Sequence, residues 1–273
     1  MTSSLHPILL FTDVDGCLLN KTDYDCGPAI PVLRRLRENN VPVILSSSKT
    51  GRELRALAAE LKLSPAPLIC ENGGQILWQG TQWPTREATC PGTSRDVILD
   101  VLSELKLAFR FRSFRDLGLE GVMQATDLPS AKAQMATERS STEPLLWDDA
   151  PERIEAFRES LSRKSLTLTK GGRFWHVAGA ATKGSAMKMV MQEYRNGSFT
   201  LPLTVSIGDS PIGQSMLNIA DVPIGIPAPD GTLNVDINTA KGVVSAQHGS
   251  LGWAESVARV LDNLMQSTGT ANI

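Results

Sequence analysis

The segment Ile8-Leu9-Leu10-Phe11-Thr12-Asp13-Val14-Asp15-Gly16 decides the predicted fold. Its first four residues form a short apolar run that is typical of a buried strand, and two carboxylates and a glycine follow almost at once. A strand that ends in this way places its acidic side chains beyond its carboxyl end. In doubly wound sheets this is where ligands bind.

Apolar runs alternate with helical patterns toward both ends of the chain. The predicted strands are Ile8–Phe11, Val41–Leu45, Leu68–Cys70, Leu203–Ile207, Ile224–Ile226 and Val243–Ala246. The predicted helices are Pro28–Asn39, one that begins at Thr50 with Glu53 in capping-box spacing, Lys183–Tyr194, Pro211–Ala220 and Trp253–Met265. Strands that alternate with helices of this length predict an α/β fold with a doubly wound parallel sheet.

The middle of the chain has a different character, with helices and strands that do not alternate regularly. Its predicted helices are Ser94–Leu107, Leu128–Thr137 and Pro151–Ser162, and its predicted strands are Phe109–Arg112, Pro144–Trp147, Leu166–Thr169 and Phe174–Val177. Arg110, Arg112 and Arg115 are expected to alternate along an edge strand. We therefore expect a core of residues 1–83 and 180–273 that is interrupted by an inserted α+β cap, residues 84–179.

The composition is that of an ordinary globular protein, with 41% hydrophobic and 21% charged residues among 273. The 27 basic and 29 acidic side chains give a net charge of -2, which predicts no binding of nucleic acid or of an anionic membrane surface. An anionic ligand must then be captured by local charges. Four cysteines lack metal or disulfide spacing, and no apolar run is long enough to span a bilayer, so we expect a cytoplasmic protein.

The two carboxylates after the first strand suggest covalent phosphate chemistry. Asp13 could attack phosphorus to form an aspartyl-phosphate, while Asp15 could protonate the leaving oxygen and later activate water. Gly16 allows the chain to turn sharply. A cation-binding or simple polar turn is the alternative interpretation of the same residues.

Three further groups follow predicted strands or begin predicted helices. Ser46-Ser47-Ser48-Lys49 could hold phosphate oxygens or could form a plain turn, and Lys183 could neutralise phosphate charge or be solvated. Asp209 in Gly208-Asp209-Ser210 could complete an oxygen-rich magnesium site or could cap a helix.

Asp13-Val14-Asp15-Gly16, Ser47, Lys183 and Gly208-Asp209 resemble, in order and spacing, the four motifs of phosphatases of the haloacid dehalogenase superfamily, and the insertion resembles their C2-type cap. The resemblance implies a core of that fold and a phosphatase with Asp13 as nucleophile and Asp15 as general acid and base. It further implies Ser47 and Lys183 as phosphate-holding residues. Asp13, Asp209 and the Asp15 carbonyl would be ligands of Mg²⁺.

A narrower resemblance is to mannosyl-3-phosphoglycerate phosphatases. It rests on Val41–Thr50, Glu71-Asn72-Gly73-Gly74, the stretch Arg139–Pro144 and Gly172-Arg173-Phe174-Trp175-His176-Val177. It implies a phosphorylated glycoside as the small-molecule partner. We expect a monomer or homodimer. The candidate substrate contacts that it implies are Lys49, Asn72, Gly73, Arg139, Glu143, Arg173 and His176.

Three positions depart from that resemblance. Cys17 replaces a usual threonine, Ile212-Gly213 replaces a usual Asn-Asp pair, and Ser140 and Thr142 stand where Glu and Ser are usual. We expect the second change to weaken magnesium binding. The expected substrate is mannosyl-3-phosphoglycerate or a close glycosyl phosphoglycerate; the alternatives are a broader sugar-phosphate or sucrose-phosphate-type phosphatase, or a degenerate phosphosugar-binding module without turnover.

Overall fold

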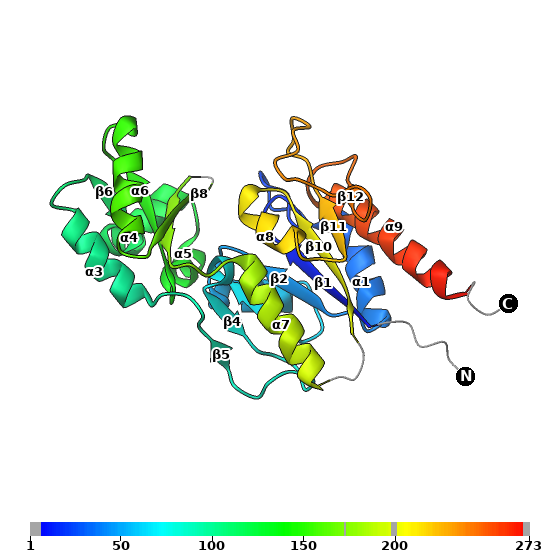
Figure 1. The fold of residues 1–273 in the computed structure, drawn as a ribbon. Helices are drawn as coiled ribbons and strands as arrows, with labels where there is room; N and C mark the ends of the chain where they lie inside the picture. Colours follow the sequence, from blue (N-terminus) through cyan, green and yellow to red (C-terminus); the bar gives the residue numbers. More distant parts are fainter. Residues whose placement is uncertain (1–6, 172, 198–200, 270–273) are drawn as a thin grey trace.

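The computed structural model describes residues 7–171, 173–197 and 201–269 and contains two sheets (Figure 1). The main sheet has eight strands in the order β12-β11-β10-β1-β2-β3-β4-β5. Its strands are β1 (Ile8–Asp13), β2 (Val43–Ser46), β3 (Leu68–Cys70), β4 (Gln75–Leu77), β5 (Ala88–Thr89), β10 (Leu203–Gly208), β11 (Val222–Gly225) and β12 (Val243–Val244). The run from β12 to β3 is parallel, and β4 and β5 add antiparallel pairs at one edge.

Helices cover both faces of the main sheet, because side chains along a strand point alternately to opposite faces. Leu10 of β1 belongs to the apolar cluster on the face of α1 (Ile30–Glu38), α2 (Gly51–Glu60) and α9 (Gly249–Gly269). Leu9 and Phe11 belong to the cluster on the other face, with α7 (Lys183–Gly197) and α8 (Gln214–Leu217). The predicted doubly wound α/β fold is therefore confirmed.

The second sheet lies within the predicted insertion and is antiparallel, in the order β6-β7-β9-β8. Its strands are β6 (Phe111–Ser113), β7 (Thr142–Trp147), β9 (Trp175–Ala178) and β8 (Thr167–Lys170). α3 (Arg95–Leu105) and α6 (Ile154–Ser162) share one apolar cluster with it. α4 (Phe114–Thr126) and α5 (Ser130–Thr137) share another, through Phe114 and Phe174.

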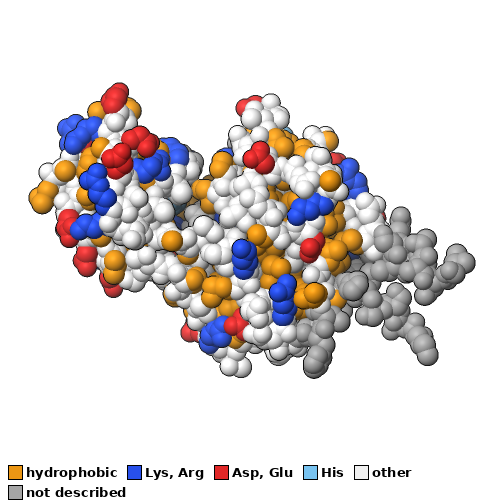
Figure 2. Space-filling view, viewed as in Figure 1, with side chains coloured by type: hydrophobic (Ala, Val, Ile, Leu, Met, Phe, Trp, Pro, Cys, Tyr) orange, Lys and Arg blue, Asp and Glu red, His pale blue; other side chains and the backbone are white. Residues whose placement is uncertain are grey.

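We call this segment, from α3 to β9, the cap. It stands to one side of the main-sheet lobe in Figure 1, and the two lobes meet across a notch in Figure 2. β5 still pairs with β4, so the segment that begins at 84 also contributes one strand to the main sheet. We propose the division into 1–83, 84–179 and 180–273, with one strand of the middle segment added to the main sheet. Among the helices of the described residues, none is long and apolar enough to cross a membrane.

Local signals explain which elements were predicted. The capping box of α2 forms as expected: the Thr50 hydroxyl accepts from Glu53 N at 3.3 Å, and the Glu53 carboxylate accepts from Thr50 N at 2.8 Å.

The prediction for Arg110, Arg112 and Arg115 is wrong in part, because β6 is an edge strand that ends at Ser113, and Arg115 lies in the first turn of α4. α4 was not predicted, since Gly118 interrupts its helical pattern with a φ of 61°.

The cap has its own aromatic core, which generates a prediction about stability. Phe157 is fully buried, with ring centroids 5.1 Å from Trp147, 5.2 Å from Phe109 and 5.2 Å from Phe111. Phe157→Ala should lower the free energy of unfolding by about 3–5 kcal/mol, because it leaves a cavity among these rings. Leu107→Ala, at a cap residue that is 92% exposed, is the control and should change it by less than about 0.5 kcal/mol. Equal losses in denaturant melts of the two variants would contradict the assigned core.

Candidate active site

The carboxyl ends of three neighbouring strands bring the predicted residues together. Asp13 ends β1 and pairs in register with Ser46 at the end of β2. On the other side of β1, β10 ends at Gly208, directly before Asp209. Parallel strands that end at the same edge gather the polar residues that follow them. Asp13, Ser47 and Asp209 therefore converge, as the sequence predicts.

Asp13 forms a buried ion pair. Its Oδ2 lies 2.6 Å from Lys183 Nζ, and its Oδ1 accepts from Val14 N at 2.8 Å. Lys183 is only 2% exposed, and its Nζ also donates to the Ser46 carbonyl at 3.0 Å. Lys183 begins α7, so this helix delivers the cation to the tip of β1. One oxygen of Asp13 is fixed by the backbone, and the other is paired with a buried ammonium.

A second buried carboxylate lies beside this pair. The pKa of Asp209 is raised to about 6, first by burial and then by the negative charge of Asp13. Gly16, with a φ of 85°, lets the chain pass directly over Asp209, since a Cβ there would lie 2.4 Å from Asp209 Oδ2. Lys21 approaches Asp209 only to 4.0 Å. The one buried cation near these two carboxylates in the described residues, Lys183, is thus bound to Asp13 and not to Asp209.

This excess of negative charge suits a divalent cation. The carboxylates of Asp13 and Asp209 lie together here, and the family resemblance adds the backbone carbonyl of Asp15; such a small set of oxygens holds magnesium when water and substrate complete the shell. In the described part of the chain no three His, Cys, Asp or Glu side chains cluster as ligands. The donor set therefore fits a hard cation bound by two carboxylates.

Asp15 is held by Lys49. Lys49 Nζ lies 2.9 Å from Asp15 Oδ1 and 2.8 Å from Oδ2, and Tyr24 places its ring 5.7 Å from the same ammonium. Lys49 was predicted as a substrate contact; here its cation is engaged by the predicted acid and base. Ser47 is 1% exposed, and its hydroxyl accepts from Lys49 N at 3.3 Å, so the Ser47–Lys49 loop lies beside both carboxylates of the first strand.

Three more residues that were predicted to contact the substrate lie at this loop or beside one another: Asn72, Arg139 and His176. Asn72 N donates to the Ser47 carbonyl at 2.9 Å, and Arg139 of the cap donates from Nη1 to the Ser48 carbonyl at 3.2 Å. His176 lies near enough to Arg139 that the arginine charge lowers its pKa. Asn72 Oδ1, Arg139 Nε and His176 Nδ1 are buried without a hydrogen-bond partner among the described residues. Buried polar atoms of this kind are available to a bound ligand.

The other residues that were predicted to contact the substrate have roles within the protein itself: Glu143 and Arg173 bind other side chains, and Gly73 allows a close backbone approach. Glu143 is fully buried and accepts from Arg95 Nε at 2.7 Å and from Arg115 N at 2.8 Å. The exposed Arg173 pairs with Asp127 at 2.8 Å, and its neighbour Gly172 lies outside the described residues. Gly73, with a φ of 102°, has no room for a side chain, since a Cβ would lie 2.2 Å from the Thr182 carbonyl. It lets its loop pack against the residue before Lys183.

Two of the departures noted in the sequence border the site. Burial raises the pKa of the Cys17 thiol well above its usual value, and the charge of Asp209 raises it further, so Cys17 stays a neutral thiol rather than a nucleophile. A Cβ added to Gly213 would lie 3.7 Å from Asp13 Oδ2, which places this position directly beside Asp13.

Glu71 is a buried charged residue at the site that is not among the candidate residues predicted from the sequence, although its loop, Glu71-Asn72-Gly73-Gly74, carries part of the family resemblance. It is 1% exposed and contacts the cap segment Ser140–Thr142. The available signal was a charged residue directly after the buried strand β3.

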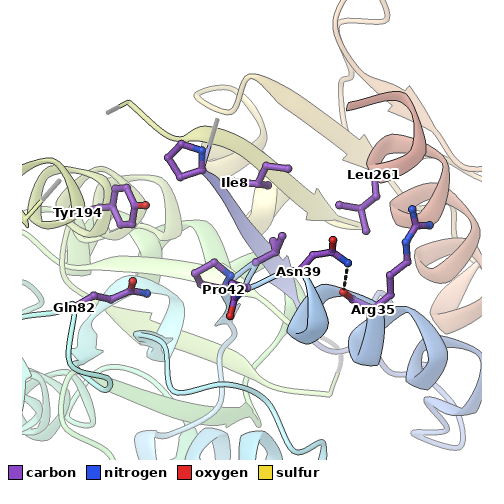
Figure 3. Close-up of a pocket in the computed structure, with 10 residues that line it drawn as sticks. Ile8, Arg35, Asn39, Pro42, Gln82, Tyr194 and Leu261 are labelled. Carbon is purple, nitrogen blue, oxygen red and sulfur yellow. Dashed lines mark hydrogen bonds between the residues drawn. The ribbon is translucent and has the colours of Figure 1, made fainter. Parts of the chain in front are cut away.

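A cavity of about 240 Å³ lies at the opposite end of the main sheet (Figure 3). It is lined by Pro7, Ile8, Arg35, Pro42, Tyr194 and Leu261, among others. β1 runs from Ile8 to Asp13, so this cavity is roughly 16 Å from Asp13 at about 3.3 Å per residue. It contains no carboxylate and takes no part in the arrangement described above.

The environment of His176 predicts how stability depends on pH. Burial first, and then the charge of Arg139, lower the pKa of His176 to about 3. The unfolded chain binds this proton near pH 6.5, so the stability that depends on neutral His176 is complete above pH 6.5 and is lost as the pH falls toward 3. Between pH 6.5 and 5 the wild type should therefore lose up to about 2 kcal/mol more than His176→Gln.

Denaturant unfolding at a series of pH values measures this difference, and His248→Gln, at an exposed histidine, is the matched control. The control should follow the wild type. Identical pH profiles for the wild type and His176→Gln would show that His176 is not buried in its neutral form.

Comparison with known proteins identifies the family. Residues 10–227 match the model of the haloacid dehalogenase-like hydrolases. The chain is 32% identical over 271 residues to a protein of Persephonella marina named glucosyl-3-phosphoglycerate/mannosyl-3-phosphoglycerate phosphatase, an alignment that covers 94% of this chain and 98% of the relative.

Solved structures share the fold. A protein from Thermoplasma acidophilum matches with a TM-score of 0.67 at 17% identity, over 95% of this chain and 99% of its own. A haloacid dehalogenase-like hydrolase from Bacteroides thetaiotaomicron matches with a TM-score of 0.67 at 15% identity, over 93% of this chain and 99% of its own. A subclass IIB sugar phosphatase of the superfamily matches with a TM-score of 0.63 at 13% identity, over 94% of this chain and 98% of its own. With the four motifs assembled at one sheet edge, the chain belongs to the haloacid dehalogenase-like hydrolases and is a phosphatase.

Proposed function

We propose that this phosphatase is magnesium-dependent and hydrolyses a glycosyl-3-phosphoglycerate through an aspartyl-phosphate on Asp13. The supporting observation is the buried Asp13–Lys183 pair beside Asp209, with Arg139 of the cap reaching the adjacent Ser47–Lys49 loop. The first part of this arrangement suits phosphoryl transfer, and the second brings a cation of the cap close to the loop proposed to hold phosphate, which favours a substrate with an anionic leaving group. The name of the Persephonella marina relative supports the choice of substrate.

In the proposed mechanism, Asp13 attacks phosphorus, and the bond from phosphorus to the glycerate oxygen breaks. That oxygen takes a proton from Asp15. Asp15 then removes a proton from the water that hydrolyses the aspartyl-phosphate, so the proton returns and phosphate leaves. Lys183 and the Ser47 loop hold the phosphate oxygens. Asp13 and Asp209 would hold a magnesium ion, which would supply positive charge to neutralise the phosphate.

Lys49 orients Asp15 in this scheme. Its two contacts, at 2.8 and 2.9 Å, hold the Asp15 carboxylate by both oxygens. A carboxylate held in this way has a defined direction, which is a requirement for proton transfer at hydrogen-bond distance. We therefore propose that Lys49 acts on the substrate through Asp15 as well as by its own charge.

The substrate is mannosyl-3-phosphoglycerate in our first choice, and the glucosyl compound is a close relative of it. Arg139 Nε and His176 Nδ1 are buried in the cap and have no hydrogen-bond partner within the described part of the chain, so they can receive polar groups of a substrate that is larger than a simple phosphate. A broader sugar phosphatase or a sucrose-phosphate-type phosphatase is the alternative. A module without turnover would not need both Asp13 and Asp15.

A substrate panel tests the proposal. With millimolar magnesium, kcat/KM should be highest for mannosyl- or glucosyl-3-phosphoglycerate and lower for sucrose 6-phosphate and p-nitrophenyl phosphate. Asp13→Asn should remove phosphate release, and Asp15→Asn should slow turnover by about 10²–10⁴-fold on the glycosides, because their leaving oxygen needs a proton. Preference for sucrose 6-phosphate would favour the alternative, and full activity of Asp13→Asn would refute the mechanism.

Gly213→Asp tests the metal site by binding rather than by activity. The backbone at Gly213 has a φ of -79° that any residue can adopt, and no atom lies closer than 3.7 Å to an added Cβ. A carboxylate there should tighten magnesium binding about tenfold, measured by calorimetry. Without metal it should lower the melting temperature, because it adds a third negative charge beside Asp13 and Asp209. Gly213→Asn is the neutral control, and unchanged magnesium affinity in Gly213→Asp would contradict this location.

A further inference from the structure

Glu71 occupies a strained turn between the core and the cap. It follows β3 directly, with a φ of 51°, and the next two residues, Asn72 and Gly73, have φ values of 58° and 102°. Only glycine adopts such angles readily, so a glutamate there is maintained by interactions that outweigh the local cost. Its side chain is only 1% exposed.

The carboxylate of Glu71 accepts hydrogen bonds from three successive residues of the cap. Oε1 accepts from Ser140 N at 2.7 Å, while Oε2 accepts from Ser141 N at 3.0 Å and from the Thr142 hydroxyl at 2.6 Å. Arg139 Nη1 lies 4.0 Å from Oε2 and is the nearby positive charge. A buried carboxylate with three donors forms stronger bonds than neutral groups do. This contact therefore holds the start of β7 against the core.

The same turn contacts the catalytic loops on its core side. Glu71 N donates to the Lys49 carbonyl and Asn72 N to the Ser47 carbonyl, both at 2.9 Å. Gly73 packs against Thr182, the residue before Lys183. These core-side contacts are made by the backbone of the turn and do not involve the Glu71 carboxylate, so a change confined to the carboxylate acts on the cap side alone.

We infer that Glu71 is a positioning residue for the substrate: its carboxylate fixes Ser140–Thr142 to the core and thereby places Arg139 over the Ser48 carbonyl. Arg139 precedes this segment directly, and its Nη1 bonds both the Ser48 carbonyl, at 3.2 Å, and the Thr142 hydroxyl, at 2.7 Å. Thr142 in turn donates to Glu71. Glu71 thus acts on the substrate through Arg139, and this inference rests on the proposed function for the ligand that Arg139 contacts.

Glu71→Gln is the test, because it keeps the shape of the side chain but replaces one acceptor oxygen by an NH₂ group. The NH₂ group is itself a donor, and it must face another donor: either Ser140 N or the two donors Ser141 N and the Thr142 hydroxyl. KM for mannosyl-3-phosphoglycerate should rise about tenfold with kcat within about threefold, since a remote binding group is displaced. For p-nitrophenyl phosphate, which is too small to need Arg139, kcat/KM should stay within about threefold. Amide exchange at Ser140 and Ser141, measured by NMR, should become faster.

Ser141→Ala is the matched control. Ser141 is buried in the same segment, and its hydroxyl donates to the Gly74 carbonyl at 3.0 Å. The hydrogen bond from its backbone N–H to the Glu71 carboxylate does not depend on the side chain. It should keep the wild-type KM on both substrates. If Glu71→Gln does not fold, Thr142→Val removes one donor to Glu71 and should raise KM for the glycoside by about threefold.

Two outcomes would overturn the inference: proportional losses on both substrates in Glu71→Gln, or an equal KM increase in Ser141→Ala. A wild type that hydrolyses p-nitrophenyl phosphate but no glycosyl phosphoglycerate would count against the proposed function alone. The exchange rates at Ser140 and Ser141 need no substrate, so they still test whether Glu71 fixes the cap. Unchanged rates in Glu71→Gln would refute that role.

Discussion

The buried pair of Asp13 and Lys183 is the constraint on which the site depends. A carboxylate and an ammonium that are almost fully removed from water are stable together only when each has a partner at bonding distance. Lys183 meets this condition with two acceptors, Asp13 and the Ser46 carbonyl. Its helix must therefore begin at the carboxyl ends of β1 and β2. The polypeptide can satisfy this requirement only by returning to the main sheet after the cap.

The second constraint is that one cation does not balance the carboxylates at this edge. Asp209 keeps a raised pKa because burial and the negative charge of Asp13 outweigh the lowering effects of Lys21 and Lys183. Asp15 escapes this crowding by turning toward Lys49. The two aspartates of the first motif thus have different cations and different environments. This is the physical basis for giving one the role of nucleophile and the other that of proton carrier.

Much of this arrangement could be predicted because parallel strands end at a common edge. Asp13, Ser47, Asp209 and Lys183 each follow a strand or begin a helix that its apolar pattern reveals, so their convergence needs no knowledge of side-chain contacts. The engagement of Lys49 by Asp15 could not be predicted, since it depends on the side-chain conformations of two residues on separate loops. The same is true of Glu143, which is held by Arg95.

The elements that escaped prediction are those with weak local signals. β4 and β5 have three and two residues, too few for a periodic pattern to emerge, and they are specified by pairing with β3. α4 contains Gly118 in the left-handed region, yet Ser113 and Asp116 form a capping box that marks its start. Tertiary packing on Phe114 and Phe174 decides its structure more than intrinsic propensity does.

The attachment of the cap explains how Ser140 and Thr142 can depart from the pattern of the related phosphatases without loss of the contact to the core. Ser140 gives Glu71 only its backbone N–H, so the usual glutamate at this position could provide the same bond. Thr142 gives a hydroxyl, which the usual serine also has. What changes is the side chain of Ser140, whose hydroxyl accepts from Gln75 at 3.2 Å. The hydrogen bonds between Glu71 and the cap therefore tolerate substitution at both Ser140 and Thr142. They have no substitute for the carboxylate of Glu71, because it accepts hydrogen bonds at both of its oxygens.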